Sequence, residues 1–136
     1  MQHEEIVALS KHRLERADEC LGAAKSLLSS DQIASVPNRS YYAVFHAMRA
    51  VLAMNEIDMK HHSGIISEFR KLYIKTGIFE KSMSDTISAL FDSRTGGDYD
   101  DFYIVSRQEA VDNLNKAELF VNEVKNYLHS LHCTKE

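Results

Sequence analysis

The sequence has little of what strand-rich, secreted or membrane proteins need. It contains one proline and five glycines in 136 residues, too few for an all-β chain with a turn roughly every ten residues. No stretch approaches the roughly 18 apolar residues of a membrane span, and the N-terminal MQHEEIVALSKHRLER lacks the pattern of a signal peptide. Cys20 and Cys133 belong to no recognisable motif, so we expect reduced thiols and a cytoplasmic location.

Positive charge is also scarce. The chain has 16 lysines and arginines against 20 acidic residues, a net charge of -4, so no overall basic field attracts nucleic acid. An RNA site would have to be built from a few local arginines and histidines. The apolar fraction of 44% is typical of globular proteins, and we expect residues 1–136 to form a single domain.

Apolar residues recur at spacings of three and four along nearly the whole chain, which is the pattern of amphipathic α-helices. We therefore expect an all-α fold, an up-and-down helical bundle of four long helices and five in total. The first and last helices should be antiparallel neighbours. The expected helices cover residues 4–29, 37–55, 63–75, 80–93 and 106 to near the C-terminus.

Local signals set several of these boundaries. Pro37 suits the first turn of the second helix, and Gly77 suits the left-handed position that follows the third. Ser106 and Glu109 form a capping box that begins the last helix. The stretch RTGGDYDDFYIVS, with two adjacent glycines and three aspartates, is expected to be an irregular loop.

The second helix carries residues that can do chemistry. Arg39 and His46 are seven residues apart, which is two turns or roughly 10 Å along the axis, and both point the same way. Ala43, Ala50 and Ala53 lie on the same side, where small residues let another surface come close. We expect this alanine face to meet its own copy across a two-fold axis in a homodimer.

The segment RSYYAVFH, from Arg39 to His46, resembles the motif of the HEPN superfamily, in which an arginine is followed by a histidine after four to six residues. The longer phrase NRSYYAVFHAMRAVL is similar to a prokaryotic HEPN branch of uncharacterised proteins related to toxins of toxin–antitoxin systems. The later phrases HHSGIISEFRKLYIKTG and SRTGGDYDDF are similar to the same branch. The resemblance covers about residues 37–102.

The resemblance implies a metal-independent endoribonuclease, or a toxin-like RNA-acting protein, in which two subunits form one composite cleft. Arg39 would bind the scissile phosphate, since its charge is permanent. His46 would be the acid or base acting on the RNA 2′-hydroxyl or the leaving oxygen. On the helical wheel Tyr42 lies between the core and Arg39, where it would either stack on an RNA base or lie in an interface. Arg49, at the edge of the same face, would add to phosphate binding. The implied partners are RNA, a second copy and a nucleotidyltransferase antitoxin, and no cofactor or metal is implied.

A different function stays open beside this one. His46 would then be a packed helical histidine, and Arg39 would form a surface or interface salt bridge. The protein would be a non-catalytic helical partner module that binds a nucleotidyltransferase or a nucleotide. Residue 48 is Met, where many HEPN toxins carry a tyrosine that the partner nucleotidyltransferase modifies, so that modification site is absent.

Two clusters have the residue types of metal sites, but we expect no metal at either. His129, His132 and Cys133 have a spacing compatible with Zn²⁺, yet no further ligand accompanies them. Adjacent His61 and His62 point in different directions on a helix, so capping or surface roles are favoured over a shared metal.

The aspartates that follow the adjacent glycines Gly96 and Gly97 suggest Mg²⁺ only weakly. Asp98, Asp100 and Asp101 lack a phosphate-cradling glycine loop, and Asx turns in a solvated loop explain them more simply. Arg94 and Asp98 are expected to form a structural clasp that holds this loop.

Overall fold

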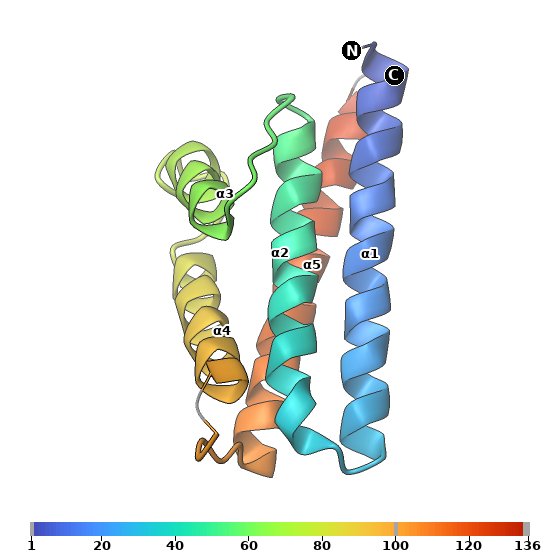
Figure 1. The fold of residues 1–136 in the computed structure, drawn as a ribbon. Coiled ribbons are helices and arrows are strands. Elements are labelled where there is room, and N and C mark those ends of the chain that lie inside the picture. Colours follow the sequence, from blue (N-terminus) through green and yellow to red (C-terminus); the bar gives the residue numbers. More distant parts are fainter. Residues whose placement is uncertain (1, 100, 135–136) are drawn as a thin grey trace.

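The computed structural model describes residues 2–99 and 101–134, and all regular structure within them is helical. Four long helices run alternately in opposite directions (Figure 1). They are α1 (His3–Ser29), α2 (Val36–Ala53), α4 (Ser82–Tyr99) and α5 (Arg107–Thr134). The predicted all-α up-and-down bundle is therefore confirmed.

Shorter elements connect the long helices. A 3-10 turn, η1 (Ile33–Ser35), joins α1 to α2. The fifth α-helix, α3 (His62–Phe69), continues into a π-helical segment, η2 (Arg70–Ile74), and the chain then turns back into α4. None of the helices in the described ranges is long and apolar enough to cross a bilayer.

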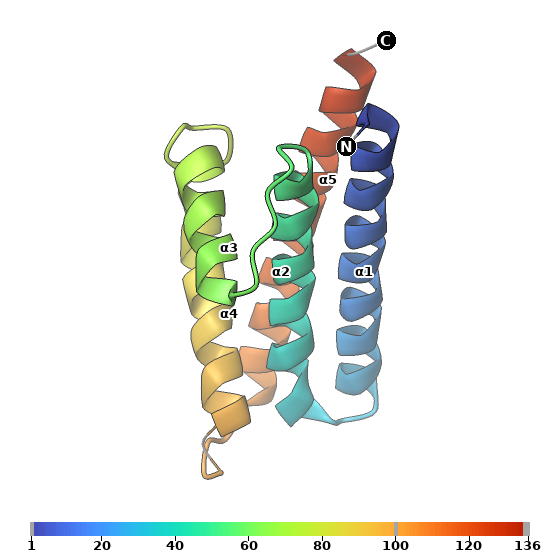
Figure 2. The ribbon, with the colours of Figure 1, turned by 45° about the horizontal axis from the view of Figure 1, so that its top comes forward.

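Helix α2 is the centre of the bundle. It contacts α1, α3, α4 and α5, and it lies between α1 and the α3–α4 pair in both views of the ribbon (Figures 1 and 2). The apolar side of α2 faces the hydrophobic core. Its core residues include Tyr41, Val44, Phe45, Met48, Val51 and Leu52.

The alanine face of α2 was predicted to meet a second copy of the protein, and this prediction was wrong. Ala43 and Ala50 have no exposed surface and Ala53 retains 3%. Helix α1 of the same chain packs along this side, and the Ser10 hydroxyl donates a hydrogen bond of 2.8 Å to the carbonyl oxygen of Ala50. The small side chains allow α1, rather than another subunit, to approach the α2 backbone closely.

Helix α4 extends to Tyr99, beyond its expected end at Ser93, so the segment RTGGDY is helical and not a loop. Arg94 forms an ion pair with Asp98 one turn later, at 3.1 Å, and Asn38 of α2 donates to the same carboxylate at 3.1 Å. Such contacts offset the low helix propensity of the two glycines.

The remaining boundaries follow the sequence signals. The Ser106 hydroxyl accepts a hydrogen bond of 3.0 Å from the backbone N–H of Glu109, as the capping box predicts. Gly77 has a φ of +84°, the left-handed conformation expected there. Helix α5 packs antiparallel beside α1, where Lys125 pairs with Asp18 at 2.7 Å, so the expected neighbours are confirmed.

Ala50→Leu should lower the free energy of unfolding by about 1–3 kcal/mol, because a larger side chain forces α1 away from α2. The control Ala8→Leu lies on the exposed side of α1 and should change stability by no more than about 0.5 kcal/mol. Urea unfolding followed by circular dichroism measures both. An Ala50→Leu protein of unchanged stability that dissociates into subunits would instead place this face between two chains.

Candidate functional site

A single polar stripe is the only part of α2 that is not buried. All other residues of the helix, from Val36 to Ala53, are buried. The stripe residues recur at helical spacing, and we call them the α2 stripe: Asn38, Arg39, Tyr42, His46 and Arg49. The four residues that the sequence proposed for the site all belong to it, so the fold brings them to one face.

Arginines gather around the α2 stripe, although the chain as a whole is acidic. Five of the seven arginines in the sequence contribute, and they come from three helices: Arg13 and Arg16 of α1, Arg39 and Arg49 of α2, and Arg94 of α4. The charges of the first four act on His46, and Arg94 donates a hydrogen bond of 3.2 Å to the Tyr42 hydroxyl. The site therefore has a local positive field of the kind that binds anions.

His46 stands in the middle of this field. Its ring lies beside those of Tyr42 and Phe45, with centroids 6.3 and 5.9 Å away. Burial, followed by the charges of the four arginines from α1 and α2, lowers the pKa of His46 from 6.5 to about 4. The imidazole is therefore neutral at pH 7. Its Nδ1 is buried and has no hydrogen-bond partner among the described residues.

Arg39 keeps an unneutralised charge. Its Nε and Nη2 donate to the Oδ1 atom of Asn38 at 2.9 and 2.6 Å, and its guanidinium carbon lies 5.2 Å from the centroid of the Tyr42 ring. Both partners are neutral, and Arg39 forms no ion pair within the part of the chain that the structure describes. The surface salt bridge considered from the sequence is therefore not formed among these residues, and the charge is available to an anionic ligand.

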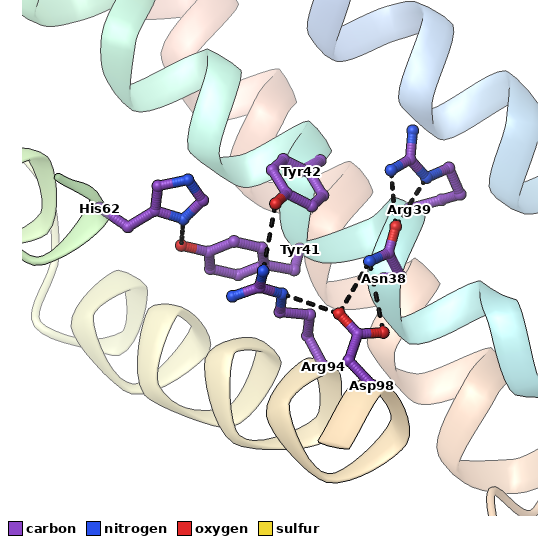
Figure 3. A network of polar contacts seen from close by, with 7 residues as sticks. All are labelled: Asn38, Arg39, Tyr41, Tyr42, His62, Arg94 and Asp98. Atoms are coloured by element: carbon purple, nitrogen blue, oxygen red, sulfur yellow. Dashed lines mark hydrogen bonds and ion pairs between the residues drawn. The ribbon is translucent and has the colours of Figure 1, made fainter. Parts of the chain in front are cut away.

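A network of polar contacts holds the Arg39 side chain in position (Figure 3). Asn38, which accepts from Arg39, donates to both carboxylate oxygens of Asp98 at 3.1 and 3.4 Å. Asp98 accepts from Arg94 at 3.1 Å, and Arg94 reaches the Tyr42 hydroxyl. The expected clasp between Arg94 and Asp98 is present, within a helix instead of a loop. Asn38 and Asp98 thus position Arg39, a role that the sequence reasoning missed.

A second histidine lies at the other side of the α2 stripe. His62, at the start of α3, shares a hydrogen bond of 2.9 Å with the Tyr41 hydroxyl and stacks on Phe45 at 4.1 Å between centroids. Burial raises the pKa of Tyr41 to about 12, so the phenol keeps its proton. Burial, with the charges of Arg94 and Arg49, lowers the pKa of His62. The surface or capping role expected for this residue is replaced by a packed position beside the site.

The sequence carries a signal for Arg13 that its helical spacing alone did not explain. Arg13 interrupts the apolar spacing of the first helix, and a charged residue on a buried face signals a specific partner. In the structure it is 7% exposed. It donates to the backbone carbonyl oxygen of Arg49 at 3.1 Å and forms an ion pair with Asp58 at 3.2 Å. Helix α1 therefore supplies part of the site.

The metal candidates find no support in the described residues. No group of three or more histidines, cysteines and acidic residues is arranged there to hold an ion. The side chains of His132 and Cys133, and the whole of Asp100, lie outside the described residues.

Arg16→Gln should raise the pKa of His46, because Arg16 contributes the largest of the charges that lower it. A histidine NMR titration measures this pKa directly, with Arg107→Gln, whose arginine pairs with Asp31, as the control. An equal effect of the two variants on the His46 pKa would refute the local field.

Since folding lowers the His46 pKa, the folded state binds fewer protons than the unfolded state between about pH 4 and 6.5. The free energy of unfolding therefore falls as the pH drops through this range.

Comparison with known proteins agrees with this geometry. A family model of the HEPN domain matches residues 10–127, which include the whole α2 stripe. A protein of Thermotoga maritima named "UPF0332 protein" is 32% identical over 116 residues, 85% of this chain and 88% of the relative.

Two proteins of Methanocaldococcus jannaschii carry the name "Putative toxin". They are 32% and 31% identical to this chain over 122 and 128 residues. The matches cover 90% and 94% of this chain, and 83% and 92% of the relatives. The resemblance predicted from RSYYAVFH is thereby confirmed, and the chain belongs to the HEPN domain family.

Proposed function

We propose that this protein is a toxin-like endoribonuclease that cleaves RNA without a metal, in a cleft to which two subunits contribute their α2 stripes. One observation carries the proposal. The only accessible face of the otherwise buried helix α2 carries an asparagine, an arginine that this neutral asparagine contacts, a neutral histidine, an aromatic ring and a second arginine. A stripe with structural roles alone would be expected to pair its charges with carboxylates.

The proposed chemistry follows from the states of the two central side chains. Arg39 holds the scissile phosphate and stabilises the charge that builds on it. His46, being neutral, accepts the proton of the RNA 2′-hydroxyl. The 2′-oxygen attacks phosphorus and the bond to the 5′-oxygen breaks, which leaves a 2′,3′-cyclic phosphate and a 5′-hydroxyl. The leaving 5′-oxygen takes a proton from water, and the imidazolium formed on His46 returns its proton to solvent.

We expect bound RNA to raise the pKa of His46 and so make it a stronger base. A pKa near 4 makes His46 a weak base at pH 7. The field that lowers this pKa comes in part from arginines, and a phosphodiester bound among them compensates their charge. The pKa of His46 then rises toward neutrality, so the base becomes effective when its substrate is in place.

Tyr42 and Arg49 are proposed to bind the RNA on either side of the reacting phosphate. The Tyr42 ring lies between two guanidiniums, 5.2 Å from that of Arg39 and 5.4 Å from that of Arg94. This arrangement restricts the ring, which favours stacking on an unpaired base. Arg49 lies two turns or more along α2 from Arg39 and would contact a neighbouring phosphate.

A second function is favoured by the same histidine. His46 is neutral at pH 7 because its pKa is lowered, and a neutral imidazole on the accessible face of α2 also suits a residue that forms a hydrogen bond with another protein. The α2 stripe would then be the docking surface of a non-catalytic module, and its partner would be a nucleotidyltransferase antitoxin. Both functions use the same residues, so a measurement of RNA cleavage is needed to distinguish the nuclease from the docking module.

Purified protein should cleave single-stranded RNA in the presence of EDTA and leave 2′,3′-cyclic phosphate ends. His46→Ala should reduce the rate of RNA cleavage by about 10²-fold or more, since it removes the acid–base group. Arg39→Ala should also strongly reduce this rate, because the arginine stabilises charge that is greatest in the transition state. The controls His12→Ala and Arg107→Ala change the same residue types at exposed positions and should retain activity. Absence of cleavage in the wild type, with partner binding that is lost in Arg39→Ala, would favour the docking module.

The composite cleft predicts a homodimer whose sites draw on both chains. Light scattering should show a dimer at micromolar concentration. Mixing inactive Arg39→Ala with inactive His46→Ala should restore activity, because a mixed dimer contains one site with an intact arginine and an intact histidine. Loss of activity that persists in a verified mixed dimer would assign both residues of one site to the same chain.

A further inference from the structure

A carboxylate of the loop between α2 and α3 lies between two guanidiniums near the C-terminal end of the α2 stripe. Asp58 Oδ2 is 3.2 Å from Nη2 of Arg13, and Asp58 Oδ1 accepts from Nη2 of Arg49 at 3.1 Å. Arg13 comes from α1 and Arg49 from α2, so this one carboxylate contacts side chains of both helices. The segment is the green connection between α2 and α3 in Figure 1.

The charges in this cluster do not balance. Two guanidiniums share one carboxylate, and the side chains of Arg13 and Arg49 are only 9% and 27% exposed. Burial and the neighbouring charge of Arg49 lower the pKa of Arg13, so the two cations crowd each other. The Nε atom of Arg49 is buried without a hydrogen-bond partner in the described ranges. An anion with more acceptor oxygens than Asp58 would satisfy the cluster better.

Asp58 contacts the two arginines on one side and faces solvent on the other. Its side chain is 56% exposed, in contrast to the two arginines that it contacts. A pocket of about 410 Å³ adjoins it, with Lys60 and His62 among the lining residues. The carboxylate can therefore leave toward solvent while the arginines remain fixed by α1 and α2. Arg13 is anchored independently, by its hydrogen bond to the backbone carbonyl of Arg49.

We propose that Arg13 and Arg49 form a second phosphodiester-binding subsite of the RNA cleft, which Asp58 occupies until RNA displaces it. This inference rests on the proposed function, which supplies the ligand. A carboxylate and a phosphodiester both offer two acceptor oxygens on one atom, the geometry that guanidinium donors match. Arg49 lies ten residues after Arg39 on the same stripe, roughly 15 Å along the helix, so the subsite takes a phosphate beyond the reacting one.

Binding of a fluorescent single-stranded 2′-O-methyl oligonucleotide, which lacks the attacking hydroxyl, tests the subsite without cleavage. Asp58→Asn should lower the Kd by about tenfold, because the competing carboxylate charge is gone. Asp31→Asn is the matched control, since Asp31 also pairs with an arginine, at 2.8 Å, and loses the same charge. Equal Kd changes in the two variants, or no gain in Asp58→Asn, would overturn the proposal.

Wild-type protein provides a measurement that does not depend on the folding of a variant. Hydrogen exchange of the backbone amides of residues 56–60 should become faster when the oligonucleotide binds, because the loop loses its anchor. Unchanged or slower exchange in this segment overturns the displacement of Asp58. Inorganic phosphate at the same phosphate concentration should compete only weakly, and equal competition would make this a site for free phosphate.

The outcomes also separate the subsite from the proposed nuclease. Cleavage by the wild type, with no gain of binding in Asp58→Asn, removes the subsite and leaves the nuclease standing. Tighter binding in Asp58→Asn, without cleavage of any RNA by the wild type, supports the subsite and removes the nuclease.

Discussion

The close packing of α1 on the alanine face of α2 is the constraint on which the rest of the site depends. Because Ala43 and Ala50 are fully buried, α1 lies close enough for Ser10 and Arg13 to bond with the α2 backbone. The same approach brings the arginines of α1 into the field around His46. A bulkier α2 face would hold these charges further away, so small residues that look like packing detail also set the electrostatics of the site.

The positive charges of the arginines beside the α2 stripe are only partly compensated by carboxylates. Asp98 and Asp58 both contact arginines beside the α2 stripe, and they do so differently. Asp98 is tied to Asn38 and Arg94 and positions Arg39, whereas Asp58 is exposed and contacts two arginines from different helices. One carboxylate therefore belongs to the scaffold, and the other lies where we propose that an anionic ligand binds.

The sequence predicted those features that depend on local spacing. The helical period placed Arg39, Tyr42, His46 and Arg49 on one side of α2, and the capping box placed the start of α5. Features that depend on contacts between distant segments were missed. The extension of α4 rests on Asn38, sixty residues away from Asp98, and two adjacent glycines gave the opposite signal. The partner of the alanine face was misassigned because periodicity shows which residues share a face and not which helix covers it.

We propose that the positive field of the arginines around His46 binds an RNA phosphate. The most direct test is the pKa of His46, measured by NMR in the free protein and with a bound 2′-O-methyl oligonucleotide. We expect a His46 pKa of about 4 in the free protein and a rise of about one unit or more in the complex, because the bound phosphates compensate the arginine charges. A His46 pKa that is the same with and without a saturating oligonucleotide would contradict it.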